Sequence, residues 1–195
     1  MIFYLGNSYV FEICKWADIK QGEETDICGS YKINYHMKLL LTCLTIMFLS
    51  LSVVAQDPGS AMPNAIFYNR DNSSFSTYNI PKGKKSLIIF FDATCEHCQK
   101  VVAQISKRTR ELKNVNIYMI SQDEYRSIDY FMTNFGKPLL QQKNVKVVQD
   151  RDHVFIMAFH PKQYPAIYLY GQDKSLLFNS SNQNDVPKFF KLINP

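Results

Sequence analysis

The sequence is poor in cysteine, and the motifs of several protein classes are missing from it. Its five cysteines in 195 residues are too few for a disulfide-stapled scaffold, and Cys14, Cys28 and Cys43 each stand alone. There is no internal repeat and no low-complexity tract. Zinc-finger spacing, a basic tail and an aromatic-rich RNA motif are also missing, so the net charge of +5 does not predict binding to nucleic acid.

What remains is the composition of an ordinary globular protein. Hydrophobic residues make up 46% of the chain and charged residues 20%, and the length allows one domain plus a targeting segment. The basic residues are spread along the sequence, with one cluster over residues 107–113. A solvated helix face explains that cluster without any polyanionic partner.

Residues 37–56 have the features of a secretory signal. Lys38 supplies a positive start, residues 39–54 form an uncharged Leu-rich run, and Ala55 ends a group of small residues that a signal peptidase reads. Signals begin at the N-terminus, so we expect Met37 to be the true start and residues 1–36 to be an over-extended leader. The mature chain should then begin at or near Gln56.

An uncleaved signal anchor is the alternative for the same segment. Lysines precede the apolar run and Asp57 follows it, which keeps the N-terminal side in the cytoplasm. Both readings export residues 57–195, to the bacterial periplasm if the signal is cleaved. Membrane contact is expected only through residues 37–56, and only if they are retained.

Hydrophobic periodicity over residues 57–195 predicts one α/β domain. After a polar, turn-rich start, apolar runs of strand length alternate with helical patterns. A capping-box pattern, Ser121 to Glu124, is expected to open the second helix. We predict strands at 86–91, 115–120, 145–148, 166–170 and 175–178, and helices at 96–112, 124–135, 154–159 and 186–193.

This order predicts a mixed central sheet with helices on both faces. Strand–helix–strand units require parallel strands joined by right-handed crossovers. A turn at residues 171–174 then adds an antiparallel edge. The order β-α-β-α-(β-α)-β-β-α fits a thioredoxin-like fold.

The chemistry is expected at Cys95-Glu96-His97-Cys98. Disulfide exchange needs one thiol that is readily deprotonated and a second thiol close enough to resolve the mixed disulfide. Cys95 falls between a buried strand and a helix, where free backbone N–H groups and the helix dipole stabilise a thiolate. Cys98 follows one turn later on nearly the same face. We therefore expect Cys95 to attack and Cys98 to resolve.

Other functions of the cysteine pair have less support from the sequence. A structural zinc site requires further ligands, and no cysteine follows Cys98. A c-type haem site requires histidine at position 99, which is Gln99. A permanent disulfide gains little from so short a loop. Copper delivery with His153 or His160 as a third ligand stays open. Apart from a redox-active Cys95–Cys98 disulfide, no cofactor is expected.

These residues resemble the thioredoxin superfamily and, within it, the exported TlpA/ResA-like thiol–disulfide oxidoreductases. The resemblance spans about residues 65–195 and is carried by Phe90-Phe91-x-x-x-Cys95-x-x-Cys98 and the segment 164–169. It implies a cis-proline at Pro165, with the Tyr164 backbone turned toward the sulfurs, where an extended substrate can pair. It also implies partners that are thiol- or disulfide-containing proteins, and an upstream electron donor.

The chain departs from the superfamily in its proton handling and in its length. The buried acid that the best-known members carry six residues before the first cysteine is replaced by Ile89, so Asp92, Glu96 or water must serve. The distance from Cys95 to Pro165 agrees with an inserted element around residues 124–150.

Two other functions remain as alternatives. A peroxiredoxin would need Thr three residues before its reactive cysteine, but Asp92 stands there and the threonine is Thr94. We therefore expect negligible peroxidase activity. A redox-inert binding domain would require both cysteines to be incidental.

The two residues between the cysteines are expected to tune the pair. An imidazole at His97 can donate a hydrogen bond or positive charge to the Cys95 thiolate, whereas Glu96 opposes it with a more screened negative charge. Stabilising the thiolate stabilises the reduced form. The pair should then be more oxidising than one with Gly-Pro between its cysteines.

Overall fold

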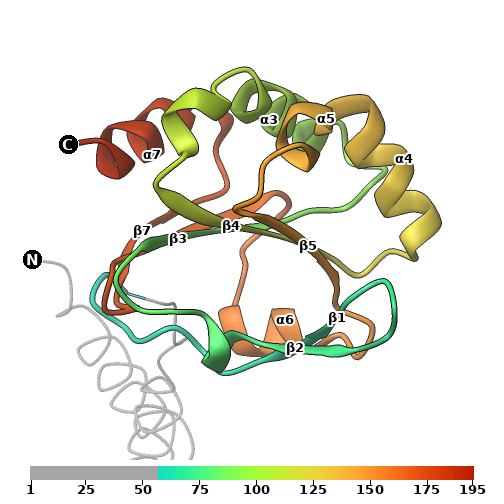
Figure 1. Cartoon of the computed structure of the whole chain (residues 1–195), viewed down its shortest axis with the longest axis horizontal. Helices are drawn as coiled ribbons and strands as arrows, with labels where there is room; N and C mark the ends of the chain where they lie inside the picture. Colours follow the sequence, from blue (N-terminus) through green and yellow to red (C-terminus); the bar gives the residue numbers. More distant parts are fainter. Residues whose placement is uncertain (1–56) are drawn as a thin grey trace, which may run out of the picture. The chain divides into compact units, whose positions relative to one another are not determined.

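The computed structural model describes residues 57–195, which form one α/β unit (Figure 1). The expected leader, residues 1–36, and signal segment, residues 37–56, lie outside the described residues. The described strands form one sheet in the order β2-β1-β5-β4-β3-β6-β7. Its strands are β1 Ile66–Tyr68, β2 Ser74–Ser76, β3 Lys85–Phe90, β4 Val115–Ser121, β5 Val145–Gln149, β6 Ala166–Tyr170 and β7 Leu176–Ser180.

The centre of the sheet has the mixed topology that the sequence predicts. Strands β3, β4 and β5 are parallel, and β6 and β7 add antiparallel neighbours on the β3 side. Helices α3, α4, α5 and α7 cover one face, and α6 lies on the other with β1 and β2 (Figure 1). The helices are α3 Glu96–Ser106, α4 Tyr125–Phe135, α5 Lys137–Leu140, α6 Val154–Phe159 and α7 Val186–Ile193.

Strand β3 is apolar throughout because it is covered on both faces. Leu87 and Ile89 point into the core under α3, whereas Ile88 and Phe90 point into a second, aromatic-rich core against α6. Alternation along a strand separates the two sets. A fully buried strand of this kind fixes the position at which the chain leaves the sheet and enters the cysteine motif.

The first part of the domain was predicted wrongly. The turn-rich stretch contains the hairpin β1–β2, with Tyr68 paired to Ser74 and residues 71–73 in its turn. Strands of three residues are too short to show an alternating pattern, so only the turn between them could be recognised from the sequence. Residues 124–150, where we expect an inserted element, form α4, α5 and β5.

Two helix boundaries also differ from the prediction. Helix α3 ends at Ser106, and a separate 3₁₀ turn, Thr109–Leu112, carries the rest of the expected apolar face. The capping box does not form, because Ser121 is the last residue of β4 and α4 begins at Tyr125 without a side-chain cap. The Ser121 hydroxyl instead contacts Asp123. Within residues 57–195, no helix is long and apolar enough to span a membrane.

Candidate active site

Cys95 lies at the N-cap of α3, at the end of the loop that follows β3. Its sulfur accepts a hydrogen bond from the Cys98 backbone N–H at 3.4 Å, and its side chain is half-buried. Asp92 shapes the loop: its carboxylate accepts hydrogen bonds from the N–H and hydroxyl of Thr94, and its carbonyl accepts one from the Cys95 N–H. A sulfur at a helix start faces backbone N–H groups that favour a thiolate.

Cys98 lies beneath it, fully buried in the core with Val102. Both thiols are free. Burial raises the pKa of the Cys98 thiol strongly, a hydrogen bond to the Asp92 backbone opposes the rise, and the neighbouring Cys95 adds to it. The two sulfurs therefore differ in kind, since one is accessible at a helix terminus and the other is held protonated in an apolar core.

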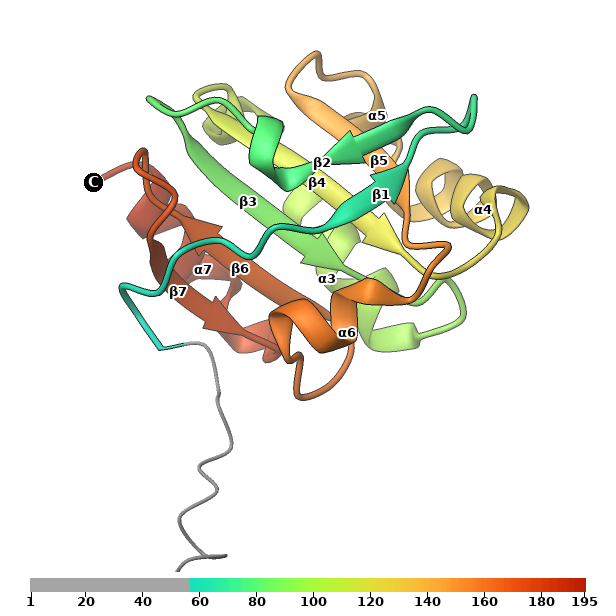
Figure 2. The same cartoon turned by 90° about the horizontal axis from the view of Figure 1, so that it is seen from below.

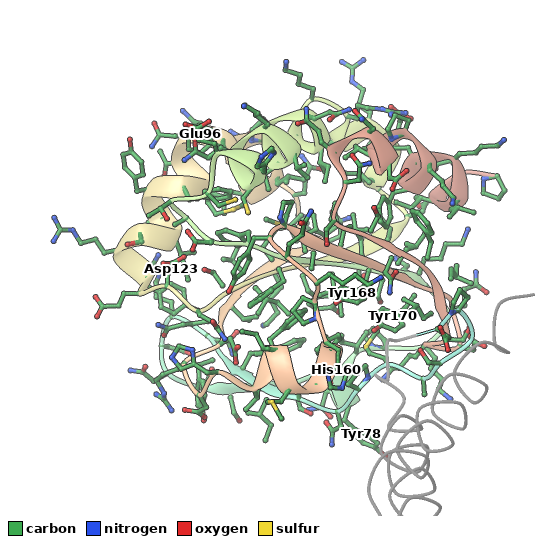
Figure 3. All side chains as sticks on the ribbon, turned by 180° about the vertical axis from the view of Figure 1, so that it is seen from behind. Tyr78, Glu96, Asp123, His160, Tyr168 and Tyr170 are labelled. Carbon is green, nitrogen blue, oxygen red and sulfur yellow. The ribbon has the colours of Figure 1, made fainter. Side chains whose placement is uncertain are left out.

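Asp123, in the loop that follows β4, holds the cysteine loop. Its carboxylate accepts hydrogen bonds from the Ala93 N–H at 2.8 Å and from the Ser121 hydroxyl at 2.7 Å. Ala93 is buried, so its N–H needs a protein acceptor. Figure 3 shows Asp123 and Glu96 at the same edge of the domain. Sequence analysis assigned Asp123 to a capping box and missed this role.

Tyr164 precedes Pro165, just before β6 begins. The Tyr164–Pro165 peptide bond is cis, as the resemblance implies. The Tyr164 ring packs against both hydrophobic cores, with its centroid 4.9 Å from that of Phe90. Burial raises the pKa of the Tyr164 hydroxyl, as do the nearby Asp92 and Asp123, so it remains a neutral donor. The part of Pro165 in substrate binding stays a prediction.

A chain of hydrogen bonds anchors Tyr164 from behind. Its hydroxyl donates to the Gln122 side chain at 3.3 Å, and Gln122 donates to Asp150 at 3.0 Å. Asp150 is fully buried and accepts the N–H groups of Val154 and Phe155 at the start of α6. Asp123 and Asp150 follow the ends of parallel strands, where polar residues gather at one sheet edge; that position is the signal that could have found them.

The remaining predicted site residues are exposed or apolar. Glu96 and His97 are both exposed, and Glu96 lies 3.7 Å from Lys100. Ile89 is fully buried in the core that also holds Cys98, so no acid lies in the strand at that position.

The described residues form no candidate metal site. Across residues 57–195, no three His, Cys, Asp or Glu side chains are placed to hold a metal ion. His153 and His160 flank α6, at its two ends. The copper-delivery alternative, which needs one of these histidines beside the two cysteines, gains no support from this arrangement.

Comparison with known families identifies the chain. The sequence profile of the AhpC/TSA family matches residues 58–178. The chain belongs to the AhpC/TSA family. No match is found among curated proteins. The matched range of this family member contains the cysteine motif, the inserted element and Pro165.

Solved structures similar to this AhpC/TSA family member share its thioredoxin-like fold. The thioredoxin domain of a thiol-disulfide oxidoreductase from Bacteroides vulgatus is 19% identical, with a TM-score of 0.55 over 71% of this chain and 99% of that one. A secreted Mycobacterium tuberculosis disulfide oxidoreductase, homologous to E. coli DsbE, is 16% identical, with a TM-score of 0.53 over 66% and 95%. A peroxiredoxin-like protein from Aquifex aeolicus is 13% identical, with a TM-score of 0.56 over 72% and 89%. Family and fold together make the chain a thioredoxin-like oxidoreductase.

Proposed function

We propose that this protein exchanges thiols and disulfides with partner proteins outside the cytoplasm, through Cys95 and Cys98. The observation that carries the proposal is the contrast between the two sulfurs. Cys95 is accessible and caps α3, whereas Cys98 is buried directly behind it, with its N–H on the Cys95 sulfur. That is the arrangement of an attacking and a resolving thiol.

In the reductive direction, the Cys95 thiolate attacks one sulfur of a partner disulfide. A Cys95–partner disulfide forms, and the other partner sulfur leaves as a thiolate that takes a proton from solvent. Cys98 then loses its proton and attacks the Cys95 sulfur. The Cys95–Cys98 disulfide forms, the second partner thiolate leaves, and two electrons have passed to the partner.

The proton of Cys98 needs an acceptor, because burial holds that thiol protonated. Asp92 is the candidate with a contact to this thiol, because its backbone lies within hydrogen-bonding reach of Cys98. Glu96 is exposed and faces Lys100. We assign Asp92 as the proton acceptor. A thiol reductant regenerates the dithiol, and reversal of the same steps oxidises a partner dithiol.

Action outside the cytoplasm is supported by the signal-like residues 37–56 and by the fold shared with a secreted disulfide oxidoreductase. Outside the cytoplasm, the Cys95–Cys98 pair encounters secreted proteins whose disulfides form in an oxidising compartment. The substrates of this chain are accordingly thiol- or disulfide-containing exported proteins.

Trapping of mixed disulfides tests the proposal. Cys98→Ser leaves the attacking thiol without its resolving partner, so it should accumulate disulfide-linked complexes with reduced-and-reoxidised insulin and with exported proteins. Cys95→Ser is the matched control and should trap few. The products are separated without reductant and identified by mass. Equal trapping by the two variants contradicts the assigned roles.

A peroxide assay separates the proposal from the peroxiredoxin alternative. The Asp92 carboxylate occupies the place of the threonine that a peroxiredoxin needs, and it is engaged by Thr94. We expect negligible consumption of hydrogen peroxide. A Cys95-dependent rate typical of peroxiredoxins would overturn this expectation.

A further inference from the structure

The amino ends of the central strands form a basic surface, away from the cysteine pair. Strands β3, β4 and β5 are parallel and therefore start at one edge of the sheet, where the turn between β6 and β7 also lies (Figure 2). At least one lysine stands just before each of these three strands, and the turn carries another. We call this surface the basic end, and it consists of Lys82, Lys84, Lys113, Lys143 and Lys174.

The fold brings these lysines together from four separate segments. Strands β3 and β4 pair from their first residues, which sets the loops before them side by side. The Gly83 N–H donates to the Gln172 carbonyl at 2.9 Å and ties the loop before β3 to the β6–β7 turn. The Asn144 amide donates to the Leu112 carbonyl at 2.7 Å and ties the loop before β5 to the turn before β4. The lysines thus share one surface that no local stretch of sequence reveals.

The charges of the basic end are open to an external anion. Four of its side chains are exposed and form no salt bridge within residues 57–195: Lys82, Lys84, Lys113 and Lys143. The nearby Glu111 is already bound to Arg108, at 2.6 Å. Asp57 and Asp173 offset only two of the five positive charges, so the surface stays basic.

The chain also enters the domain beside the basic end. The Gly59 N–H donates to the carbonyl of Leu176 at 2.7 Å, two residues after Lys174. Asp57 follows the apolar run of residues 39–54 by three residues, which is at most about 10 Å of extended chain. If that run stays in a membrane as an anchor, the basic end cannot move far from the lipid headgroups.

We propose that the basic end docks on anionic phospholipid headgroups, with residues 37–56 retained as the membrane anchor. Lysines next to a membrane are attracted to anionic lipids. Lysine is a flexible point charge, which suits a fluid array of phosphates better than one fixed ligand. Tyr78 is 77% exposed, with the Lys174 ammonium 5.8 Å from its ring centroid, and such aromatics favour the membrane interface. The short connection to an apolar run favours a membrane over a soluble polyanion such as nucleic acid.

Docking in this way turns the cysteine pair away from the membrane, toward partner proteins. Strand β3 begins with Lys85 at the basic end and leads to Cys95 at the other, and its six residues span about 20 Å. Figure 3 shows Tyr78 and Glu96 on opposite sides of the domain. The proposal adds the folded domain to the membrane contact expected through residues 37–56, and it does not depend on the chemistry of the cysteines.

Acetylation of lysine amines, measured residue by residue with mass spectrometry, tests the docking. The full chain is reconstituted in vesicles of phosphatidylcholine alone and in vesicles with about 30% phosphatidylglycerol, so that only the headgroup charge differs. Lys84, Lys113 and Lys143 should react about fivefold more slowly in the anionic vesicles. The exposed Lys162, in the loop before β6, should be unchanged. The protection should disappear at about 0.5 M salt.

A matched pair of double variants locates the effect. Lys82→Gln with Lys84→Gln should reduce the protection of the remaining exposed lysines of the basic end to below about twofold. Arg126→Gln with Lys162→Gln removes the same charge from exposed positions at the other end of the domain, and it should keep the full protection.

Three results would overturn the docking surface: equal reactivity in the two kinds of vesicle, equal loss of protection in both double variants, or equal slowing of Lys162. A single-stranded oligonucleotide that protects the same lysines more strongly than anionic vesicles, at matched phosphate concentration, would assign the basic end to nucleic acid instead. Retention of the anchor is measured by the mass of the native membrane-bound protein, and a chain that begins near Gln56 overturns that part of the proposal.

Discussion

Helices α3 and α6 both begin beside the reactive site, but their first N–H groups are satisfied in opposite ways. In α3 the acceptor is the half-exposed sulfur of Cys95, at 3.4 Å from the Cys98 N–H. In α6 it is the carboxylate of the fully buried Asp150, at 2.9 Å from the Val154 N–H and 3.0 Å from that of Phe155. Every helix leaves such N–H groups free, and any acceptor can meet them.

This difference in the acceptor makes the Cys95 cap of α3 reactive and the Asp150 cap of α6 structural. A sulfur is a weak acceptor, and at the surface it is free to leave the helix start and bond to another sulfur. A buried carboxylate with three protein donors has no alternative partner. The same feature, a helix N-terminus at the end of a strand, thus supports chemistry in α3 and fixes the start of the helix in α6.

The largest effect is expected from breaking the cap of α6. Asp150→Ala leaves two backbone N–H groups and the Gln122 amide without an acceptor, so the free energy of unfolding should fall by about 3 kcal/mol. Urea denaturation of the reduced protein measures it. Cys95→Ala, the same change at α3, should cost less than about 1 kcal/mol. Equal costs would show that the two caps do not differ.

Loosening the loop that leads into α3 should have the next largest effect. Asp123→Ala leaves the buried Ala93 N–H unpaired, which should cost about 1–2 kcal/mol and speed hydrogen exchange at that amide. Asp123→Asn keeps a carbonyl acceptor and should restore most of the protection. If alanine and asparagine behave alike, the bond to Ala93 does not hold the loop.

Two of these anchors, Asp123 and Gln122, show why the sequence predicted only part of the site. The strand before Cys95, the cysteine spacing and Pro165 are local patterns, and β3 pairs with β6 so that Phe90 lies opposite Ala166. Asp123 meets an N–H thirty residues away in sequence, and Gln122 meets an acid 28 residues on. No local pattern specifies such partners, because the sheet register decides them. The polar run after β4 was therefore assigned to a helix cap.

A smaller effect follows from the raised pKa of Cys98 in the folded protein. The folded state keeps the Cys98 proton at a pH where the unfolded chain has lost it. The resulting stability is complete below the thiol's ordinary pKa of about 9 and is lost as pH rises above it. Between pH 8 and 10, reduced wild type should lose about 1 kcal/mol more than Cys98→Ala, by urea denaturation at each pH. Parallel curves would contradict the burial of this thiol.

The smallest effect concerns His97, between the two cysteines. The direct hydrogen bond to Cys95 that the sequence allows is not among the contacts formed by residues 57–195, and the side chain is exposed. His97 can then act on the Cys95 sulfur only through its charge across solvent, an effect that is weak and screened by salt. An imidazolium favours the Cys95 thiolate and hence the reduced pair. His97→Gln should therefore make the reduction potential more negative.

The size and salt dependence of that shift decide between charge and hydrogen bonding. A surface charge effect amounts to about 10 mV, against about 30 mV for a hydrogen bond worth about 1.4 kcal/mol. The shift should be present at low salt and shrink at high salt, because dissolved ions screen charges that act through solvent. Glu96→Gln, which removes a negative charge, should move the potential the other way by a similar amount, measured by equilibration with glutathione. A shift of about 30 mV or more that persists at high salt would instead mean that His97 bonds Cys95 directly, and α3 would then present a side-chain donor to its reactive sulfur as well as its own N–H groups.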